Sequence, residues 1–458
     1  MKTETWINYE PAQLEELEQI STSYRVFLDA AKTERECISE SIRLAQEAGY
    51  RRLDGTVKPG DKVYITAMGK IAAFFHLGQA PVTQGINILG AHVDSPRLDV
   101  KQKPFYEDEG LAYWDLHYYG GIKKYQWVTL PLAIHGVVVR KDGTAVSVTV
   151  GEDPADPVLC VTDLLPHLAG EQLEKKADKV IAGEALDALV GSIPLKDEKE
   201  KAVKANILRI VKERYSVEED DFLSAELELV PAGQAREAGL DRSMIMAYGH
   251  DDRVCAYSSL YALLNAKPSQ RTLCCFLVDK EEIASTGATS AQSDFFKNAL
   301  AELLEAAEGF SELKLRRCLQ MSAMLSSDVT AAFDPIYPSV CEKRTSAFLG
   351  KGINFSKYLG SRGKVSTNDA NPEFIAQLRK IMDDAEVSYQ MSELGHVDAG
   401  GGGTIASLFA QYGMQVMDCG VPVLSMHSPG EIISKADLYE AVRCYKAFLQ
   451  QAEVRSKP

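Results

Sequence analysis

The chain has 458 residues, of which 45% are hydrophobic and 25% charged, and its formal net charge is -15. This length and composition predict a globular protein of two or three domains and exclude the fibrous and disordered classes. The acidic charge argues against a nucleic-acid partner or an anionic membrane surface.

The nine cysteines form no Cys-x-x-Cys pair, and Cys274 and Cys275 lie inside an apolar run as small core residues do. The amino terminus lacks a basic segment followed by an apolar core, and no later apolar run reaches membrane-spanning length. We therefore expect a protein of the reducing cytoplasm with no membrane partner.

The first elements are helical and then extended. Residues 11–48 carry apolar side chains at three- and four-residue steps, which predicts a core-facing helical region. Alternating apolar residues at 62–68 and 71–75 predict a hairpin with Gly69 at its turn. A further strand ends at His92.

The pattern changes after Asp94. Segments 113–119, 127–135, 136–140 and 145–150 have the character of short β-strands. A charged stretch from about Gly170 to Tyr215 then predicts helix, and its run of Lys and Glu at 196–204 predicts a solvated helix face.

Residues of the type that bind metals pause in this region and resume at Asp251, which is the pattern of an inserted domain. We therefore expect a catalytic domain in two parts, 1–94 and 236–458, interrupted by a smaller β-rich insertion at 95–235. The second part alternates strand-like and helix-like segments, which predicts an α/β fold with a mostly parallel sheet. Its last helix is predicted to begin at Ser434-Lys-Ala-Asp437, a pattern similar to a capping box.

Five apolar segments lead directly into polar residues that can bind metal. They are Ile86-Asn-Ile-Leu-Gly-Ala-His92-Val-Asp94, Ile245-Met-Ala-Tyr-Gly-His-Asp251-Asp252-Arg253, Leu273-Cys-Cys-Phe-Leu-Val-Asp-Lys-Glu281-Glu282, Met324-Leu-Ser-Ser-Asp328 and Val423-Leu-Ser-Met-His427-Ser428. Each apolar run has the length of a buried strand, and ligands of an open α/β sheet gather beyond the carboxyl ends of its strands. The polar residues are therefore expected to converge.

Any one of these residues, taken alone, is better explained as a cap, a turn residue or a satisfied core group. As a set, two histidines and several carboxylates suit zinc, with cobalt and manganese as alternatives. The set also leaves over one glutamate that need not bind metal, which favours a two-metal hydrolase.

These motifs resemble the aspartyl aminopeptidase family, whose members are cytosolic metallopeptidases with two co-catalytic metals and a tetrahedral dodecamer. The resemblance covers most of the chain and rests on motifs in the family's order: His92-Val-Asp-Ser-Pro, Leu132-Ala-Ile-His135, Asp279-Lys-Glu-Glu, Ser326-Ser-Asp, Gly402-Gly-Thr-Ile and Met426-His-Ser. It implies a metallopeptidase domain interrupted by an oligomerisation domain.

The resemblance also implies a role for each residue of the site. The implied metal ligands are Asp251 as the bridge between two divalent ions, His92 and Asp328 on one ion, and Glu282 and His427 on the other. Glu281 is implied as the general base that takes a proton from a metal-bridging water, and Asp94 as the carboxylate that orients His92. Asp252 stays an alternative to Asp251 as the bridge.

Four further residues are implied in substrate binding. His135 resembles a histidine that a neighbouring subunit contributes to the pocket, although a core histidine is the alternative. Lys351, seven residues before Tyr358, resembles the lysine that binds an acidic substrate side chain, in a segment that departs from the family version. Gly402 and Gly403 are expected to offer backbone beside the substrate or to begin a helix, and no phosphate-loop or dinucleotide motif is complete there.

The implied function is a zinc-type aminopeptidase that releases an amino-terminal Asp or Glu from peptides and assembles into a homododecamer. The alternatives are an aminopeptidase for neutral residues, a deacylase on the same scaffold, and a non-catalytic assembly protein that keeps the metals for its fold. The presence of Glu281 argues against the last, because a structural metal site needs no adjacent base.

Overall fold

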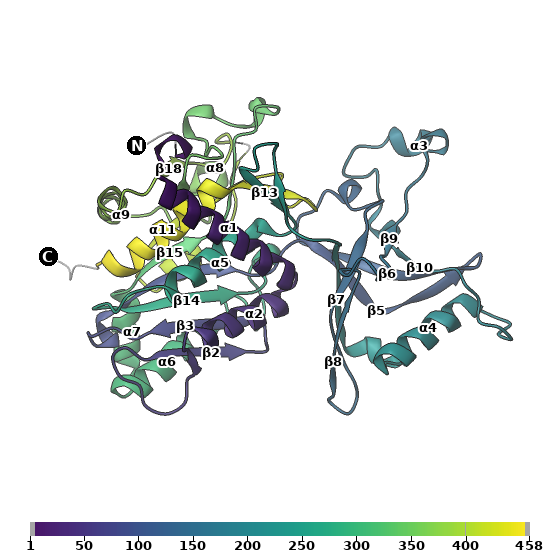
Figure 1. The fold of residues 1–458 in the computed structure, drawn as a ribbon, viewed down its shortest axis with the longest axis horizontal. Helices are drawn as coiled ribbons and strands as arrows, with labels where there is room; N and C mark the ends of the chain where they lie inside the picture. The colour runs from purple at the N-terminus through teal and green to yellow at the C-terminus, as the bar shows by residue number, and fades with distance from the viewer. Residues whose placement is uncertain (1–4, 399, 454–458) are drawn as a thin grey trace. The chain divides into compact units, whose positions relative to one another are not determined.

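The computed structural model describes residues 5–398 and 400–453, and Figure 1 traces its elements. The chain forms two compact units. The first unit runs up to Asp94, continues from Ala235 to Met426 and resumes at Glu431; the second comprises Ser95–Gln234 and the four residues His427–Gly430. Within the described residues, no helix is long and apolar enough to cross a membrane.

A nine-stranded sheet forms the centre of the first unit. In spatial order its strands are β1 (Arg51–Arg52), β2 (Lys62–Ala67), β3 (Ile71–His76), β14 (Thr272–Val278), β4 (Ile86–His92), β15 (Ala323–Ser327), β19 (Gln415–Gly420), β17 (Ile353–Ser356) and β18 (Tyr389–Ser392). The four strands β14, β4, β15 and β19 are mutually parallel, whereas β2, β3 and β17 each make antiparallel pairs. The predicted α/β fold with a mostly parallel sheet is confirmed, as is the hairpin of β2 and β3.

Helices cover both faces of this sheet. They are α1 (Pro11–Ala30), α2 (Glu34–Glu47), α5 (His250–Leu264), α6 (Phe295–Glu308), α7 (Glu312–Gln320), α8 (Ser361–Lys364), α9 (Pro372–Asp384), α10 (Ala406–Ala410) and α11 (Lys435–Gln451). Alternate residues of β14 enter different cores: Cys275 packs in a core with α1, α5 and α11, and Phe276 packs in a core with α6, α7 and α10. Helices α5 and α11 pack against each other (Figure 1). Burial on both faces explains why β4 and β14 consist mostly of apolar residues.

The helical region predicted at 11–48 is confirmed, with one interruption. Helix α1 ends at Ala30, and Thr33 begins α2 through a capping box in which its side chain accepts the backbone N–H of Glu36. The break lets the two helices take different directions while their termini stay satisfied.

A smaller five-stranded sheet completes the first unit. Its strands are β12 (Arg236–Ala238), β13 (Met244–Ala247), β21 (Glu431–Ser434), β20 (Pro422–Leu424) and β16 (Thr330–Ala331). Three of them adjoin residues of interest in the chain: β13 precedes Asp251, β16 follows Asp328, and β20 precedes His427.

The second unit is built on a seven-stranded antiparallel sheet. In spatial order its strands are β8 (Ala145–Val150), β7 (Leu132–Val139), β11 (Ala225–Pro231), β5 (Arg97–Asp108), β6 (Leu111–Tyr119), β10 (Ala188–Gly191) and β9 (Cys160–Val161). It also contains the helices α3 (Gly170–Leu173) and α4 (Ala202–Tyr215). The β-rich character predicted for this part of the chain is confirmed, although the strand expected from Trp127 begins only at Leu132.

The helical stretch predicted from about Gly170 to Tyr215 is helical only at its two ends. Only α3 and α4 are α-helical, β10 lies between them, and most of the charged run at 196–204 precedes α4 as turns. Lys and Glu favour helix intrinsically, but a helix in a protein is stabilised mainly by burying an apolar face. Such a face begins with Val203 and continues through Ile207, Ile210 and Val211 at helical spacing.

The last helix begins after Ser434 as predicted, but Asp437 does not complete a capping box. Ser434 accepts the N–H of Ala436, whereas the two carboxylate oxygens of Asp437 accept the N–H groups of Gly350 and Gly352, each at 2.7 Å. Asp437 is fully buried. It therefore ties the loop before β17 to the start of α11.

Candidate metal centre

His92 is the last residue of β4 and is 2% exposed. Its Nδ1 lies 3.0 Å from the backbone carbonyl of Asp94 and 3.3 Å from Asp94 Oδ1. Its Nε2 lies 3.1 Å from Asp251 Oδ1 and 3.8 Å from Asp328 Oδ1. With Nδ1 as the hydrogen-bond donor to Asp94, Nε2 is the candidate ligand atom.

Asp251 and Asp328 reach this imidazole from two different elements. Asp251 lies in the first turn of α5, and its N–H donates to the buried carboxylate of Glu431 at 3.0 Å. Asp328 directly follows β15, and its N–H donates to the carbonyl of Cys419 at 3.2 Å. One ligand atom from each of His92, Asp251 and Asp328 lies within 4.8 Å of the others.

Glu281 and Glu282 follow β14, on the short 3₁₀ helix Glu281–Ile283. Lys280, in a left-handed conformation with φ of 71°, turns the chain after the strand. The N–H of Glu281 donates to Asp94 Oδ1 at 3.1 Å, and the N–H of Glu282 donates to Asp94 Oδ2 at 3.2 Å. A carboxylate oxygen of Glu282 lies within 4.8 Å of one of Asp251.

The buried carboxylates perturb each other. Burial and the nearby charge of Asp252 raise the pKa of Asp328 well above its ordinary value. Burial works to lower the pKa of His92, but its hydrogen bonds to Asp251 and Asp94 raise that pKa well above the ordinary value. Both shifts arise from carboxylate charge concentrated in a buried space.

This donor set fits a divalent cation. Imidazole nitrogen and carboxylate oxygen are the ligands that zinc, cobalt and manganese accept, and a divalent charge offsets the repulsion between buried carboxylates. The orientation of His92 by Asp94 is the arrangement that accompanies metal-binding histidines.

His427 lies three residues after β20, in the segment that groups with the second unit. Its Nδ1 is 2.9 Å from the backbone carbonyl of Gly121. Nε2 is therefore its candidate ligand atom, by the reasoning that applies to His92.

His135 lies on β7 of the second unit and is 2% exposed. Its Nε2 is 2.9 Å from Glu152 Oε1, and Glu152 Oε2 also accepts the N–H of Gly233 at 3.2 Å. Within one chain, His135 is therefore buried and hydrogen-bonded to a residue of its own unit.

Lys351 and the glycines Gly402 and Gly403 lie in loops of the first unit. Lys351 precedes β17, which is antiparallel to β19, so it lies at the edge where the parallel strands end. The N–H of Gly402 donates to the carbonyl of Leu359 at 2.8 Å, and Gly403 is exposed.

Glu431 is a site residue that the sequence reasoning missed. It holds the backbone of Asp251, yet it lies in a four-residue strand with no informative periodicity. Its position four residues after His427 is the only signal in the sequence that could have pointed to it.

Known proteins are similar to this chain in both sequence and fold. Residues 27–449 match the family model described as Aminopeptidase I zinc metalloprotease (M18). A curated relative, "Probable M18 family aminopeptidase 1" of Clostridium acetobutylicum, is 58% identical over 451 residues, covering 97% of each chain. The crystal structure of an M18 family aminopeptidase from Thermotoga maritima has a TM-score of 0.94 and 43% identity, covering 99% of this chain and 100% of that chain.

A more distant structure, the mApe1 dodecamer of S. cerevisiae, has a TM-score of 0.77 and 22% identity, covers 94% of this chain and 96% of that chain, and shows the shared fold alone. The family match spans most of the chain, and the relatives of higher identity span it almost completely. The chain therefore belongs to the M18 family and is a metallo-aminopeptidase, a hydrolase of peptide bonds.

Proposed function

We propose that this aminopeptidase binds two divalent metal ions, with zinc as the native metal and cobalt or manganese as functional substitutes, and releases an amino-terminal Asp or Glu from peptides. The observation that carries the proposal is the convergence of His92, Asp251 and Asp328 in a buried space beside Glu282. Our assignment gives His92 and Asp328 to one ion, Glu282 and His427 to the other, and Asp251 to both.

Two bound ions would polarise the scissile carbonyl and lower the pKa of the attacking water. The chain's own residues supply the remaining steps. Glu281 accepts the proton of the attacking water and passes it to the leaving amine. Asp94 keeps the chain at Glu281 and Glu282 in place through both N–H groups, so that one glutamate can act as a base while its neighbour binds metal.

Acidic specificity is assigned to Lys351. Lys351 is half-buried, and no carboxylate among the described residues forms an ion pair with it. A lysine ammonium in that condition can bind the carboxylate of a substrate Asp or Glu. Gly402 and Gly403 are assigned to the same pocket as backbone that lines the substrate.

We also propose that the chain assembles into a homododecamer through the second unit, and that His135 of one subunit contributes to the substrate pocket of another. The mApe1 relative described as a dodecamer supports the assembly. We assign the protein to the cytoplasm, because all nine cysteines are free thiols.

A substrate panel with metal add-back tests this function. Metal-free protein is supplied with Zn²⁺, Co²⁺ or Mn²⁺ and assayed on aspartyl, glutamyl, leucyl and N-acetylated substrates. We expect metal-dependent hydrolysis with the highest kcat/KM on the acidic substrates. Preference for leucyl substrates would show that the enzyme is specific for neutral residues. Preference for N-acetylated substrates would indicate a deacylase. Background rates with every substrate and metal would support the non-catalytic alternative.

A further inference from the structure

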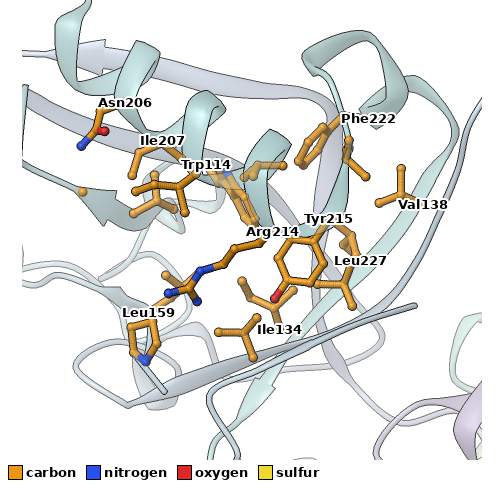
Figure 2. A pocket seen from close by; sticks show the side chains of 18 of the residues that line it. Trp114, Ile134, Val138, Leu159, Asn206, Ile207, Arg214, Tyr215, Phe222 and Leu227 are labelled. Carbon is orange, nitrogen blue, oxygen red and sulfur yellow. The ribbon is translucent and has the colours of Figure 1, made fainter. Parts of the chain in front are cut away.

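The second unit contains a cavity of about 410 Å³ between its sheet and helix α4 (Figure 2). Its walls are mainly apolar side chains from β7, β8, β11 and α4, among them Ile134, Val148, Leu227, Ile207 and Val211. The volume lies within the range of small-molecule sites, about 300–1,000 Å³. None of the residues assigned to catalysis lines this cavity, so peptide hydrolysis does not account for it.

One wall carries a buried hydrogen-bond donor. Trp114 on β6 is 5% exposed, and its indole N–H has no acceptor among the described residues. Edge contacts with Phe105 and Phe222 hold the ring, with centroids 5.7 Å from each. Buried donors are normally satisfied, and an acceptor oxygen of a ligand in the cavity would satisfy this one.

A solvent-exposed cation without an ion-pair partner among the described residues also lines the cavity. Figure 2 shows the side chain of Arg214, in the last turn of α4, extended among the lining residues. Arg209 and Lys212 on the same helix form ion pairs with Glu213 and Glu218, but within the described part of the chain no carboxylate pairs with Arg214. The end of a helix favours any cation. The helix dipole therefore does not explain why Arg214, and no other cation of α4, lines the apolar cavity.

We propose that this cavity binds an apolar monocarboxylate, with the hydrocarbon body among the aliphatic side chains and the carboxylate at the Arg214 guanidinium. Guanidinium is the side chain best suited to pair with a carboxylate, and the Trp114 N–H adds a donor that also selects an acceptor oxygen. The second unit thereby holds a ligand site separate from peptide hydrolysis.

Calorimetric titration of the full-length protein with decanoate and with decanol tests the proposal. We expect saturable binding of decanoate at about one per chain. Arg214→Gln should weaken decanoate binding roughly tenfold, because it removes a hydrogen-bonded charge pair, and should leave decanol unchanged. Lys212→Gln, which removes an exposed cation of the same helix outside the cavity, is the matched control and should bind decanoate as the parent protein does.

Val211→Trp should abolish binding by filling the cavity, and Trp114→Phe should weaken decanoate binding about threefold. Melting curves show whether each variant folds, and Ile207→Phe replaces Val211→Trp if that variant does not. Absence of saturable decanoate binding, equal affinity in Arg214→Gln, or undiminished affinity in the cavity-filling variant would overturn the proposal. The proposal would also be overturned if Val211→Trp changed the oligomeric mass and the parent protein bound no decanoate. The cavity would then be a contact between copies of the chain.

Discussion

Asp94 Oδ1 accepts the backbone N–H of Glu281 at 3.1 Å. The two residues follow β4 and β14, which are distant in sequence and adjacent in the sheet. The second oxygen of the same carboxylate accepts the N–H of Glu282, and Asp94 also contacts the imidazole of His92. One buried side chain thus fixes a proposed ligand of each metal and the proposed base. The geometry of the centre depends on that carboxylate as much as on the ligands themselves.

Asp94→Asn is expected to weaken metal binding roughly 10- to 100-fold and to lower turnover. An amide has one acceptor oxygen, so one of the two N–H groups would face the amide nitrogen instead of an acceptor. Competition with a chelator measures the affinity. Asp54→Asn, on an exposed loop, is the control and should bind metal as the parent does. Unchanged affinity in Asp94→Asn would show that the backbone holds its geometry without this carboxylate.

Glu281→Gln is expected to keep its metals and to lose turnover by roughly a hundredfold to ten-thousandfold. The amide keeps the shape of the side chain but cannot accept the proton. Elemental analysis and steady-state kinetics on the same sample test this prediction. Loss of metal together with activity would make Glu281 a ligand.

Asp251→Ala and Asp252→Ala are expected to differ. Our assignment makes Asp251 a ligand of both ions, so its loss should deplete both metals, whereas Asp252→Ala should retain both. Metal content after dialysis distinguishes them. If Asp251→Ala retained two ions, Asp252 would be the bridging ligand instead of Asp251.

Asp437→Ala is expected to lower the free energy of unfolding by about 2–4 kcal/mol, because it leaves the N–H groups of Gly350 and Gly352 without their acceptor. Urea unfolding measures the change. Asp384→Ala removes an exposed carboxylate paired with Lys380 and should change stability by less than about 0.5 kcal/mol. Equal effects of the two substitutions would contradict the structural role of Asp437.

The role of His135 across subunits is tested by complementation. His135→Phe and Glu281→Gln proteins, each inactive alone, are dissociated together and reassembled. Activity should partly return, because some sites then receive an intact histidine and an intact base from different chains. Verified mixed oligomers without activity, or a fully active monomer, would contradict the proposal.

Asp251 and His427 follow β13 and β20, which belong to the five-stranded sheet and not to the parallel strands of the large one. The other candidate ligands end or follow the buried strands β4, β14 and β15, which are parallel and bring their carboxyl ends to one edge. His92, Glu282 and Asp328 could be located from the sequence in this way. Glu431 could not, because it acts on the site through a hydrogen bond from the backbone of Asp251. Such contacts depend on tertiary packing and leave no periodic pattern.

The helical stretch predicted at 170–215 formed only in part for a related reason. Its charged residues favour helix locally, but only the segment from Val203 onward offers an apolar face that can pack. Asp437 shows the same limit at one position, since a residue placed to cap its own helix bonds a distant loop instead. In both cases tertiary contacts overrode a valid local preference.

We propose that peptide hydrolysis requires two metal ions bound by His92, Asp251, Glu282, Asp328 and His427. Titration of metal-free protein with Zn²⁺, with hydrolysis of an aspartyl peptide followed at each addition, tests it most directly. We expect activity to reach its maximum at two ions per chain. Full activity in the metal-free protein, or a maximum at one ion per chain, would contradict it.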